Sequence, residues 1–295
     1  MGSISSRPAL VVGIGVVFTA FSAIFVRLSD APPLVIATYR MGFTTLFLAP
    51  VFASHARRSR ERASRRAVAL SVLSGLVLAA HFALWISSLS YTSIASATVL
   101  VTTHPILVAI LGFLILGEQV SARGALLMLV AVGGGFLLVW EGLGRGDGSW
   151  VGDTLAVGGA ATVSVYMLIG RYVRRELSVH LYTMIVYSVA FATLLTITLI
   201  ARIPLWPYAP REFLLFAALA LLCTLLGHSL FSWALRYLPT SVVSTSILGE
   251  PVIASILAAL LFTELPTPTT LAGAAVILVA IFFFVRLRTR TGTKR

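Results

Sequence analysis

The sequence predicts an all-α membrane protein in which ten transmembrane helices form two inverted five-helix repeats. Three observations predict this: an apolar composition, ten long apolar segments, and a match between the two halves of the chain. Of 295 residues, 58% are hydrophobic and 11% are charged, and mean hydropathy is +0.99, whereas a soluble domain carries about 25% charged residues. The composition excludes a soluble enzyme, a secreted disulfide scaffold and a disordered chain.

The ten apolar segments follow one another along the chain, and each is about as long as a membrane-spanning helix. They run approximately over residues 9–28, 33–53, 67–89, 92–116, 123–141, 152–170, 179–201, 213–236, 239–262 and 268–286. Pro or Gly residues such as Pro32, Gly142 and Pro204 punctuate the connections between them, where helices end. Ser121 and Thr267 directly precede the fifth and tenth segments, and we expect them to cap those helices.

The basic residues lie mostly on one side of the membrane if the N-terminus is cytoplasmic. Of 22 Lys and Arg residues, 17 then face the cytoplasm, four face outward and Arg40 lies within the second span. This bias predicts an even number of spans in the cytoplasmic (inner) membrane, with both termini in the cytoplasm. The basic run from Arg57 to Arg66 is a topology signal or, alternatively, a site for lipid headgroups or a partner. No basic patch interleaved with aromatic residues indicates nucleic acid as a partner.

The two halves of the chain match each other. A shift of 146 residues places Tyr91 on Tyr237, His104 on Glu250, Pro105 on Pro251 and Glu118 on Glu264. The sequence therefore predicts two repeats, residues 1–146 and 147–295. Because each repeat has five spans, an odd number, the two must cross the membrane in opposite senses, which is typical of secondary transporters.

These paired motifs resemble those of the EamA-type members of the drug/metabolite transporter superfamily, over nearly the whole chain. Each unit of that family has a Pro near the middle of its fourth span, then a Glu, then a Gly- and Ala-rich fifth span. The matching residues are His104-Pro105, Gly117-Glu118 and Gly124-Ala125 in the first half, and Glu250-Pro251, Glu264 and Gly273-Ala274 in the second. Arg40 fits an early Arg of the second span, but the second half has Ser188 there.

The resemblance implies ten helices around a central cavity, and transport by alternating access. Within the superfamily the chain is most like the YddG-type exporters of amino acids. In this arrangement Pro105 and Pro251 are either hinges beside the cavity or static kinks, because a proline inside a helix removes a backbone donor. Glu118 and Glu264 are expected to act as turn or capping groups.

Glu250 is the one acidic residue clearly inside a predicted span. A charge at that depth costs roughly 2.5–3.5 kcal/mol on insertion scales, so intramembrane ionisable residues are candidates for functional sites. Glu250 is therefore expected to handle substrate or protons, or alternatively to pair structurally with His104 or Arg40. Arg40 itself either reaches the membrane interface or meets a substrate carboxylate.

Aromatic and imidazole side chains are the other candidates for a substrate site. His81 and Trp85 are four residues apart and share one face of the third span, and His228 and Trp233 lie in the eighth. The hydroxyls of three tyrosines could also reach a cavity: Tyr39, Tyr166 and Tyr187. Each of these residues could instead serve packing or an internal hydrogen bond. No metal-ligand spacing occurs, no cofactor is expected, and the single cysteine, Cys223, forms no intramolecular disulfide.

The sequence thus predicts a secondary transporter that exports amino acids, with apolar or aromatic ones favoured, or similar small metabolites. Its expected partners are a small-molecule substrate and membrane lipids, with proton coupling through Glu250 as a further hypothesis. No Walker A pattern indicates direct use of ATP. The alternatives are a passive channel or facilitator and an intramembrane enzyme, although no nucleophile or metal motif accompanies the histidines and Glu250.

Overall fold

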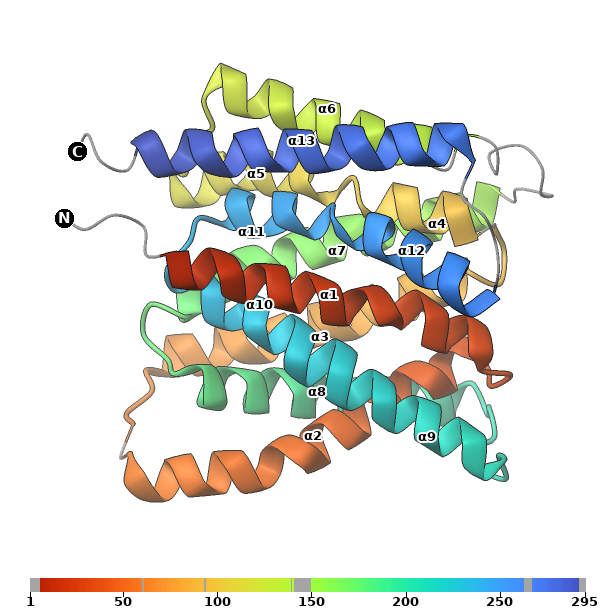
Figure 1. Ribbon diagram of the computed structural model, residues 1–295. Helices are drawn as coiled ribbons and strands as arrows, with labels where there is room; N and C mark the ends of the chain where they lie inside the picture. The colour runs from red at the N-terminus through yellow and green to blue at the C-terminus, as the bar shows by residue number, and fades with distance from the viewer. Residues whose placement is uncertain are drawn as a thin grey trace.

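The structure is a computed structural model that describes residues 6–59, 61–92, 94–138, 140, 150–262 and 267–291. Helices joined by short connections make up these residues, with no strand among them (Figure 1). The first half forms α1 (Ser6–Leu28), α2 (Pro33–Arg58), α3 (Arg65–Ser88), α4 (Ile94–Val101), α5 (His104–Leu116) and α6 (Ala122–Leu138). The second half forms α7 (Trp150–Val173), α8 (Val179–Ile200), α9 (Pro210–Ala218), η1 (Leu219–His228), α10 (Ser229–Ala234), α11 (Thr240–Ile247), α12 (Glu250–Phe262) and α13 (Pro268–Thr291).

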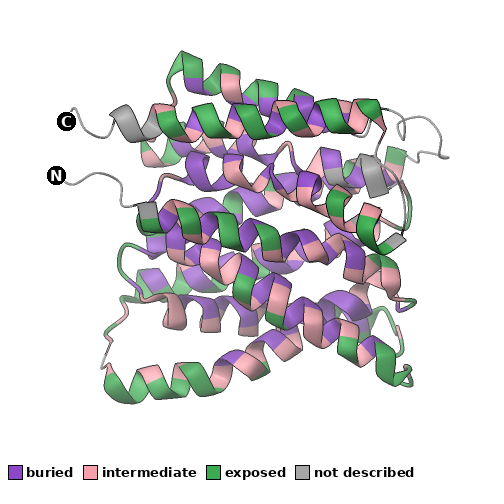
Figure 2. Cartoon of the chain, in the orientation of Figure 1, coloured by how far each residue is buried: buried purple, intermediate pink, exposed green. Residues whose placement is uncertain are grey.

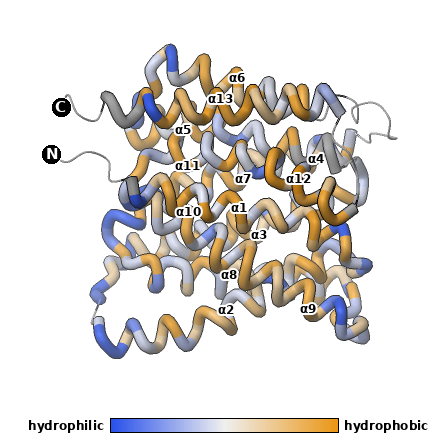
Figure 3. Tube along the Cα trace, in the orientation of Figure 1, coloured by the Kyte–Doolittle hydropathy of each residue, from blue (hydrophilic) through white to orange (hydrophobic). Residues whose placement is uncertain are grey.

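The helices give the chain the form of a multi-pass membrane protein. In the part of the chain that the structure describes, nine helical stretches are long and apolar enough to span a bilayer, and α6, with 17 residues, is shorter. A rise of about 1.5 Å per residue makes α6 about 25 Å long, near the lower limit for a span. A count of ten crossings therefore stays a prediction. Hydropathy is high along the helices and low at the two ends of the bundle (Figure 3).

Burial divides most of the longer helices into an inward and an outward side (Figure 2). Leu78, Phe82 and Tyr187 are among the buried side chains of the core, whereas Leu114 on α5 and Leu260 on α12 are about 70% exposed, at 69% and 73%. Large apolar side chains on the outside suit contact with lipid tails. α1 begins and α13 ends at the same end of the bundle (Figure 1), in keeping with an even number of passes.

The fourth and ninth predicted spans are each broken in the middle. α4 ends at Val101 and α5 begins at His104, while α11 ends at Ile247 and α12 begins at Glu250. The two breaks differ by the same 146 residues as the sequence repeat, and a proline follows each, Pro105 or Pro251. Proline suits the first turn of a helix, because the N–H it lacks has no partner there in any case. The predicted interruptions are thus present, and the hinge role stays a prediction.

The two halves are interlocked. α3 packs against α7 and α8, and η1, its counterpart under the 146-residue shift, packs against α1 and α2. α2 also packs on α8, α12 on α1, and α6 on α13. In the last pair, a Cβ on Gly273 would collide with the backbone of Leu138, and one on Gly134 would lie 3.1 Å from the carbonyl oxygen of Gly273. Small residues of this kind let two membrane helices approach closely.

Polar side chains tie the connections to helix starts. Ser121 accepts a hydrogen bond from the Gly124 N–H at 3.2 Å and Thr267 from the Thr270 N–H at 3.3 Å, which confirms both predicted caps. Two glutamates each accept a hydrogen bond from a backbone N–H at a helix start in the other half of the chain. Glu61, from the connection before α3, accepts from the Ser178 N–H at the start of α8. Glu176, from the connection before α8, accepts from the Ser64 N–H at the start of α3, at 2.8 Å.

Candidate functional site

A cavity lies at the centre of the bundle, between the two halves of the chain. Its walls come from α1, α2, α3 and α7, from η1 and α10, and from the broken spans α4–α5 and α11–α12. The space between its lining atoms, with the part open to solvent included, is about 880 Å³. Polar or ionisable side chains on the wall are Thr19, Ser22, Arg40, His81, Trp85, Thr102, His104, Tyr166, His228, Ser232 and Glu250.

Both helix breaks reach this cavity. Thr102 and His104 at one break, and Glu250 and Pro251 at the other, lie on its wall. Half-helix ends leave backbone groups without intrahelical partners, which membrane proteins tolerate where the backbone lines a cavity. Next to the first break, the Thr102 hydroxyl donates to the Val99 carbonyl at 2.9 Å. The broken spans therefore bring polar groups into the middle of an apolar bundle.

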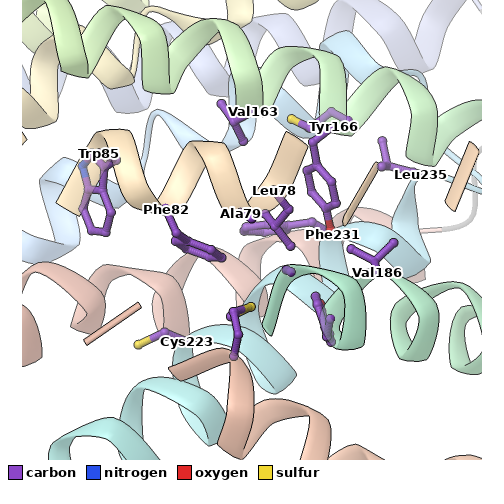
Figure 4. Close-up of a cluster of buried hydrophobic side chains, with 14 of the residues drawn as sticks. Leu78, Ala79, Phe82, Trp85, Val163, Tyr166, Val186, Cys223, Phe231 and Leu235 are labelled. Atoms are coloured by element: carbon purple, nitrogen blue, oxygen red, sulfur yellow. The ribbon is translucent and has the colours of Figure 1, made fainter. Parts of the chain in front are cut away.

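Aromatic rings form much of the wall. Phe82 and Trp85 come from α3, Tyr166 from α7 and Phe231 from α10, and Tyr166 points toward the region of Phe231 (Figure 4). The ring of Trp85 lies parallel to that of His81, with centroids 6.4 Å apart, as their spacing on one helix face predicts. Such a wall suits an apolar or aromatic group, which gains both burial and ring contacts.

Three imidazoles surround the same space. His81 shares a hydrogen bond of 2.9 Å between Nδ1 and the Gly159 carbonyl, and His104 one of 3.1 Å between Nδ1 and the Val101 carbonyl. His228 lies edge-on to Phe82, with ring centroids 5.5 Å apart. In the described ranges, no group of three or more His, Cys, Asp or Glu side chains is arranged to hold a metal ion.

Arg40 lies deep in the cavity wall, with 1% of its surface exposed. It does not reach the membrane interface, so the first of its two predicted placements is wrong. Its Nε donates to the Thr224 hydroxyl at 2.9 Å and its Nη1 to the Ser22 hydroxyl at 3.0 Å. Its Cζ lies 4.3 Å from the centroid of the Phe82 ring, a cation–π contact.

Glu250 begins α12 and is partly exposed to the cavity. A carboxylate is favoured at a helix N-terminus by the helix dipole. Its carboxyl group interacts electrostatically with Arg40, and Thr19 lies on the same cavity wall. Thr19 in turn is bonded through its hydroxyl to the Gly15 and Val16 carbonyls.

Four predicted site residues do not line the cavity. The Tyr39 hydroxyl donates to the Leu205 carbonyl at 2.7 Å, and the Tyr187 hydroxyl pairs with that of Ser229 at 3.0 Å. Trp233 packs against Tyr237, with centroids 4.6 Å apart. Pro105 is buried beside His104 but does not reach the wall. Each tyrosine has its hydroxyl satisfied by the protein, so neither needs a cavity.

Other residues on or beside the cavity wall are not predicted from the sequence. Thr19 and Ser22 are three residues apart on α1, and Ser232 on α10 pairs with the Tyr166 hydroxyl at 2.8 Å. Thr224, which holds Arg40, lies in the π-helical segment η1, where its hydroxyl donates to the Leu219 carbonyl five residues earlier. Phe231 lies on the wall with His228, as the sequence indicates for the aromatic residues of the eighth span, whereas nothing in the sequence marks a π-helix.

Glu118 and its partners lie outside the cavity. The Glu118 carboxylate receives the Arg171 Nε at 3.0 Å and the Thr240 N–H, at the start of α11, at 2.9 Å. It therefore acts as the capping group that the sequence predicts. Glu264 lies outside the described residues.

Known proteins resemble this chain over most of its length. The model of the EamA-like transporter family matches residues 7–140 and 150–286. The pseudopaline exporter CntI, from two strains of Pseudomonas aeruginosa, is 26% identical over 228 residues, which are 76% of this chain and 78% of the exporter. A solved crystal structure shares the fold, with a TM-score of 0.76 at 18% identity over 97% of this chain and 98% of the other.

Proposed function

The chain belongs to the EamA-like transporter family, and from this premise we propose that it exports amino acids or similar small metabolites across the cytoplasmic membrane. Apolar or aromatic amino acids are the favoured substrates. The observation that carries the proposal is the central cavity into which both helix breaks open. A cavity between two inverted repeats supports alternating access, in which one half rocks against the other around a fixed site.

The chemistry of the cavity supports this class of substrate. The rings of Phe82, Trp85 and Phe231 offer an apolar surface, and Arg40 and Glu250 offer one cationic and one carboxyl group. An amino acid carries a carboxylate, an ammonium and a side chain, one for each kind of surface. An acidic side chain would add a second anion beside Glu250, which opposes its binding. Export agrees with the resemblance to YddG-type exporters and with the similarity to the pseudopaline exporter CntI of Pseudomonas aeruginosa.

A competition assay in proteoliposomes tests the substrate class. We expect unlabelled phenylalanine or methionine to compete with labelled phenylalanine far better than glutamate does. Trp85→Ala removes part of the aromatic wall and should weaken phenylalanine binding by about tenfold or more, since burial of a large ring contributes about 1.5–3 kcal/mol. Trp233→Ala is the matched control, because Trp233 packs against Tyr237 away from the cavity. Glutamate competing as well as phenylalanine would contradict this proposal.

The same vesicles separate a carrier from a channel. A carrier gives slow, saturable flux, since each cycle needs a conformational change, whereas a channel gives unitary currents. We expect saturable flux without unitary currents. Incubation of the purified protein with the transported compounds should leave them chemically unchanged, and a new product would instead favour the intramembrane enzyme.

A further inference from the structure

Arg40 is a cation in the membrane interior without an ion-pair partner among the described residues. Arginines at such a depth pair with anions or backbone groups, or face a cavity, because an unpaired charge in an apolar surround is costly. Two of the three guanidinium nitrogens of Arg40 donate to neutral hydroxyls, those of Thr224 and Ser22. The third, Nη2, is buried and has no hydrogen-bond partner.

Glu250 does not fill this position. It interacts electrostatically with Arg40, but no ion pair joins the two among the described residues, and the Nη2 of Arg40 stays without a hydrogen-bond partner. The carboxyl group of Glu250 therefore balances the charge of the cavity at longer range. The guanidinium keeps an open donor.

Trp85 also has a buried donor without a hydrogen-bond partner. Its indole Nε1 is buried without a partner, and it lies on the same cavity wall as Arg40. An arginine nitrogen and an indole nitrogen can donate hydrogen bonds and cannot accept them. A ligand that satisfies both must therefore present acceptors, and for Arg40 the strongest acceptor is an anion. A carboxylate matches the guanidinium fork, and its single negative charge suits a cavity that also holds Glu250.

We infer that Arg40 anchors a carboxylate of the transported substrate through its open Nη2, an inference that rests on the proposed function. Ser22, Phe82 and Thr224 are positioning residues, since they fix the guanidinium from α1, α3 and η1. This preorganisation lowers the entropy lost when the carboxylate binds. The aromatic rings then receive the apolar part of the substrate.

Four related compounds test the anchor by their competition with labelled phenylalanine in proteoliposomes. Phenylalanine and 3-phenylpropionate carry a carboxylate, whereas phenylalaninamide and 2-phenylethylamine do not. We expect both acids to bind better than the amide and the amine by about tenfold to a hundredfold, the range for a hydrogen bond to a charged group. Ligand-induced thermal stabilisation of the purified protein provides a second readout that does not need transport.

Variants of Arg40 and of its neighbours test whether the preference for acids comes from Arg40. Arg40→Gln should remove it, and Arg40→Lys should restore it only in part, because an ammonium lacks the fork. Thr224→Val leaves the charge of Arg40 in place but removes the hydroxyl that accepts from its Nε, and should reduce the ratio of acid to amide affinity. Thr224→Ser keeps a hydroxyl and should restore that ratio. Arg211→Gln is the control, since Arg211 is exposed and donates to the Leu28 carbonyl. If Arg40→Gln does not fold, the test is the comparison of Thr224→Val with Thr224→Ser. An unchanged ratio of acid to amide affinity in Thr224→Val would then overturn the anchor.

The outcomes separate the anchor from the transport function. If the amide competes as well as the acid in wild-type vesicles, or if the variants keep the preference, the anchor is overturned and transport stands. If the acids alone stabilise the protein but no compound is transported, the anchor stands and the proposed function fails. If none of the four compounds is transported or stabilises the protein, both fail.

Discussion

Glu250 and His104 occupy equivalent positions in the two halves, each directly before a proline at the start of a half-helix. Both lie on the cavity wall. Protonation of Glu250 would remove a charge from an apolar surround, and the cost of that charge should differ between open and occluded states. A proton shifts such an equilibrium only by its differential affinity for the two states. The charged or titratable groups that line the cavity with Glu250 are Arg40, the imidazoles of His81, His104 and His228, and the phenol of Tyr166.

We predict that Glu250→Gln preserves folding but changes the pH dependence of transport, and that His104→Ala acts more weakly. The measurements are initial export rates over a pH series and the melting temperature of the same preparation. Asp153→Asn is a control, because Asp153 bonds to Thr92 and does not line the cavity. A structural Glu250 would give the opposite pattern, a lower melting temperature with an unchanged pH profile.

Residue type could be predicted from the sequence, but the direction of each side chain could not. Tyr166 and Tyr187 both lie in apolar spans, yet Tyr166 faces the cavity and Tyr187 pairs with Ser229. Trp85 and Trp233 differ in the same way. Helices that are apolar on every side carry no amphipathic signal for the inward face, so only the packing of neighbouring helices decides between such residues.

The breaks between α4 and α5 and between α11 and α12 are the elements through which the two halves could move. We predict that Pro251→Ala, which removes the ring that would clash with a carbonyl of α11 in a continuous helix across the second break, lowers the rate of transport and leaves substrate affinity nearly unchanged. A change of about 1.4 kcal/mol in the balance of states is a factor of ten in population. Pro50→Ala is the control, since Pro50 lies within α2 at an exposed position away from the cavity. An equal loss of rate in both variants would argue against a hinge at Pro251.

The connection that carries Glu176 should make stability depend on pH. The Ser64 N–H and hydroxyl donate to the Glu176 carboxylate and hold its pKa below the ordinary value. A lowered pKa in the folded state stabilises the protein above the unfolded pKa, and this contribution is lost as pH falls through the folded pKa. We predict that Glu176→Gln slightly lowers the melting temperature at neutral pH and has no effect at a pH well below 4. Thermal unfolding at both pH values measures this, and an equal loss at acid pH would assign the effect to packing.

At the level of elements the sequence was a good guide. The ten apolar segments coincide with helices or broken helices to within a few residues, because lipid demands long apolar runs. The prolines marked both breaks, and Ser121 and Thr267 marked two helix starts. The π-helical turn of η1 and the reciprocal bonds of Glu61 and Glu176 depend on contacts between distant segments, which no local pattern encodes.

The bias of basic residues predicts the orientation of the whole molecule in the membrane. We predict that a cysteine at Ser59 is labelled only from the cytoplasm and one at Ser149 only from outside, in a Cys223→Ala background. Impermeant thiol reagents applied to intact and inverted vesicles measure this. Labelling of both positions from one side, or in the reverse sense, would contradict the topology with both termini in the cytoplasm.

The interlocking of the halves bears on how the chain is made. A ribosome delivers α1, α2 and α3 to the insertion machinery before α7, α8 and η1 exist, although these are the helices against which the first three pack. Arg40 therefore enters the bilayer without Thr224, at an insertion cost of roughly 2.5–3.5 kcal/mol, and must wait for the eighth predicted span to supply its partner. Until the second half is inserted, the packing surfaces of the first half therefore stay uncovered. In that interval we expect the first half to be open to chaperones and membrane proteases.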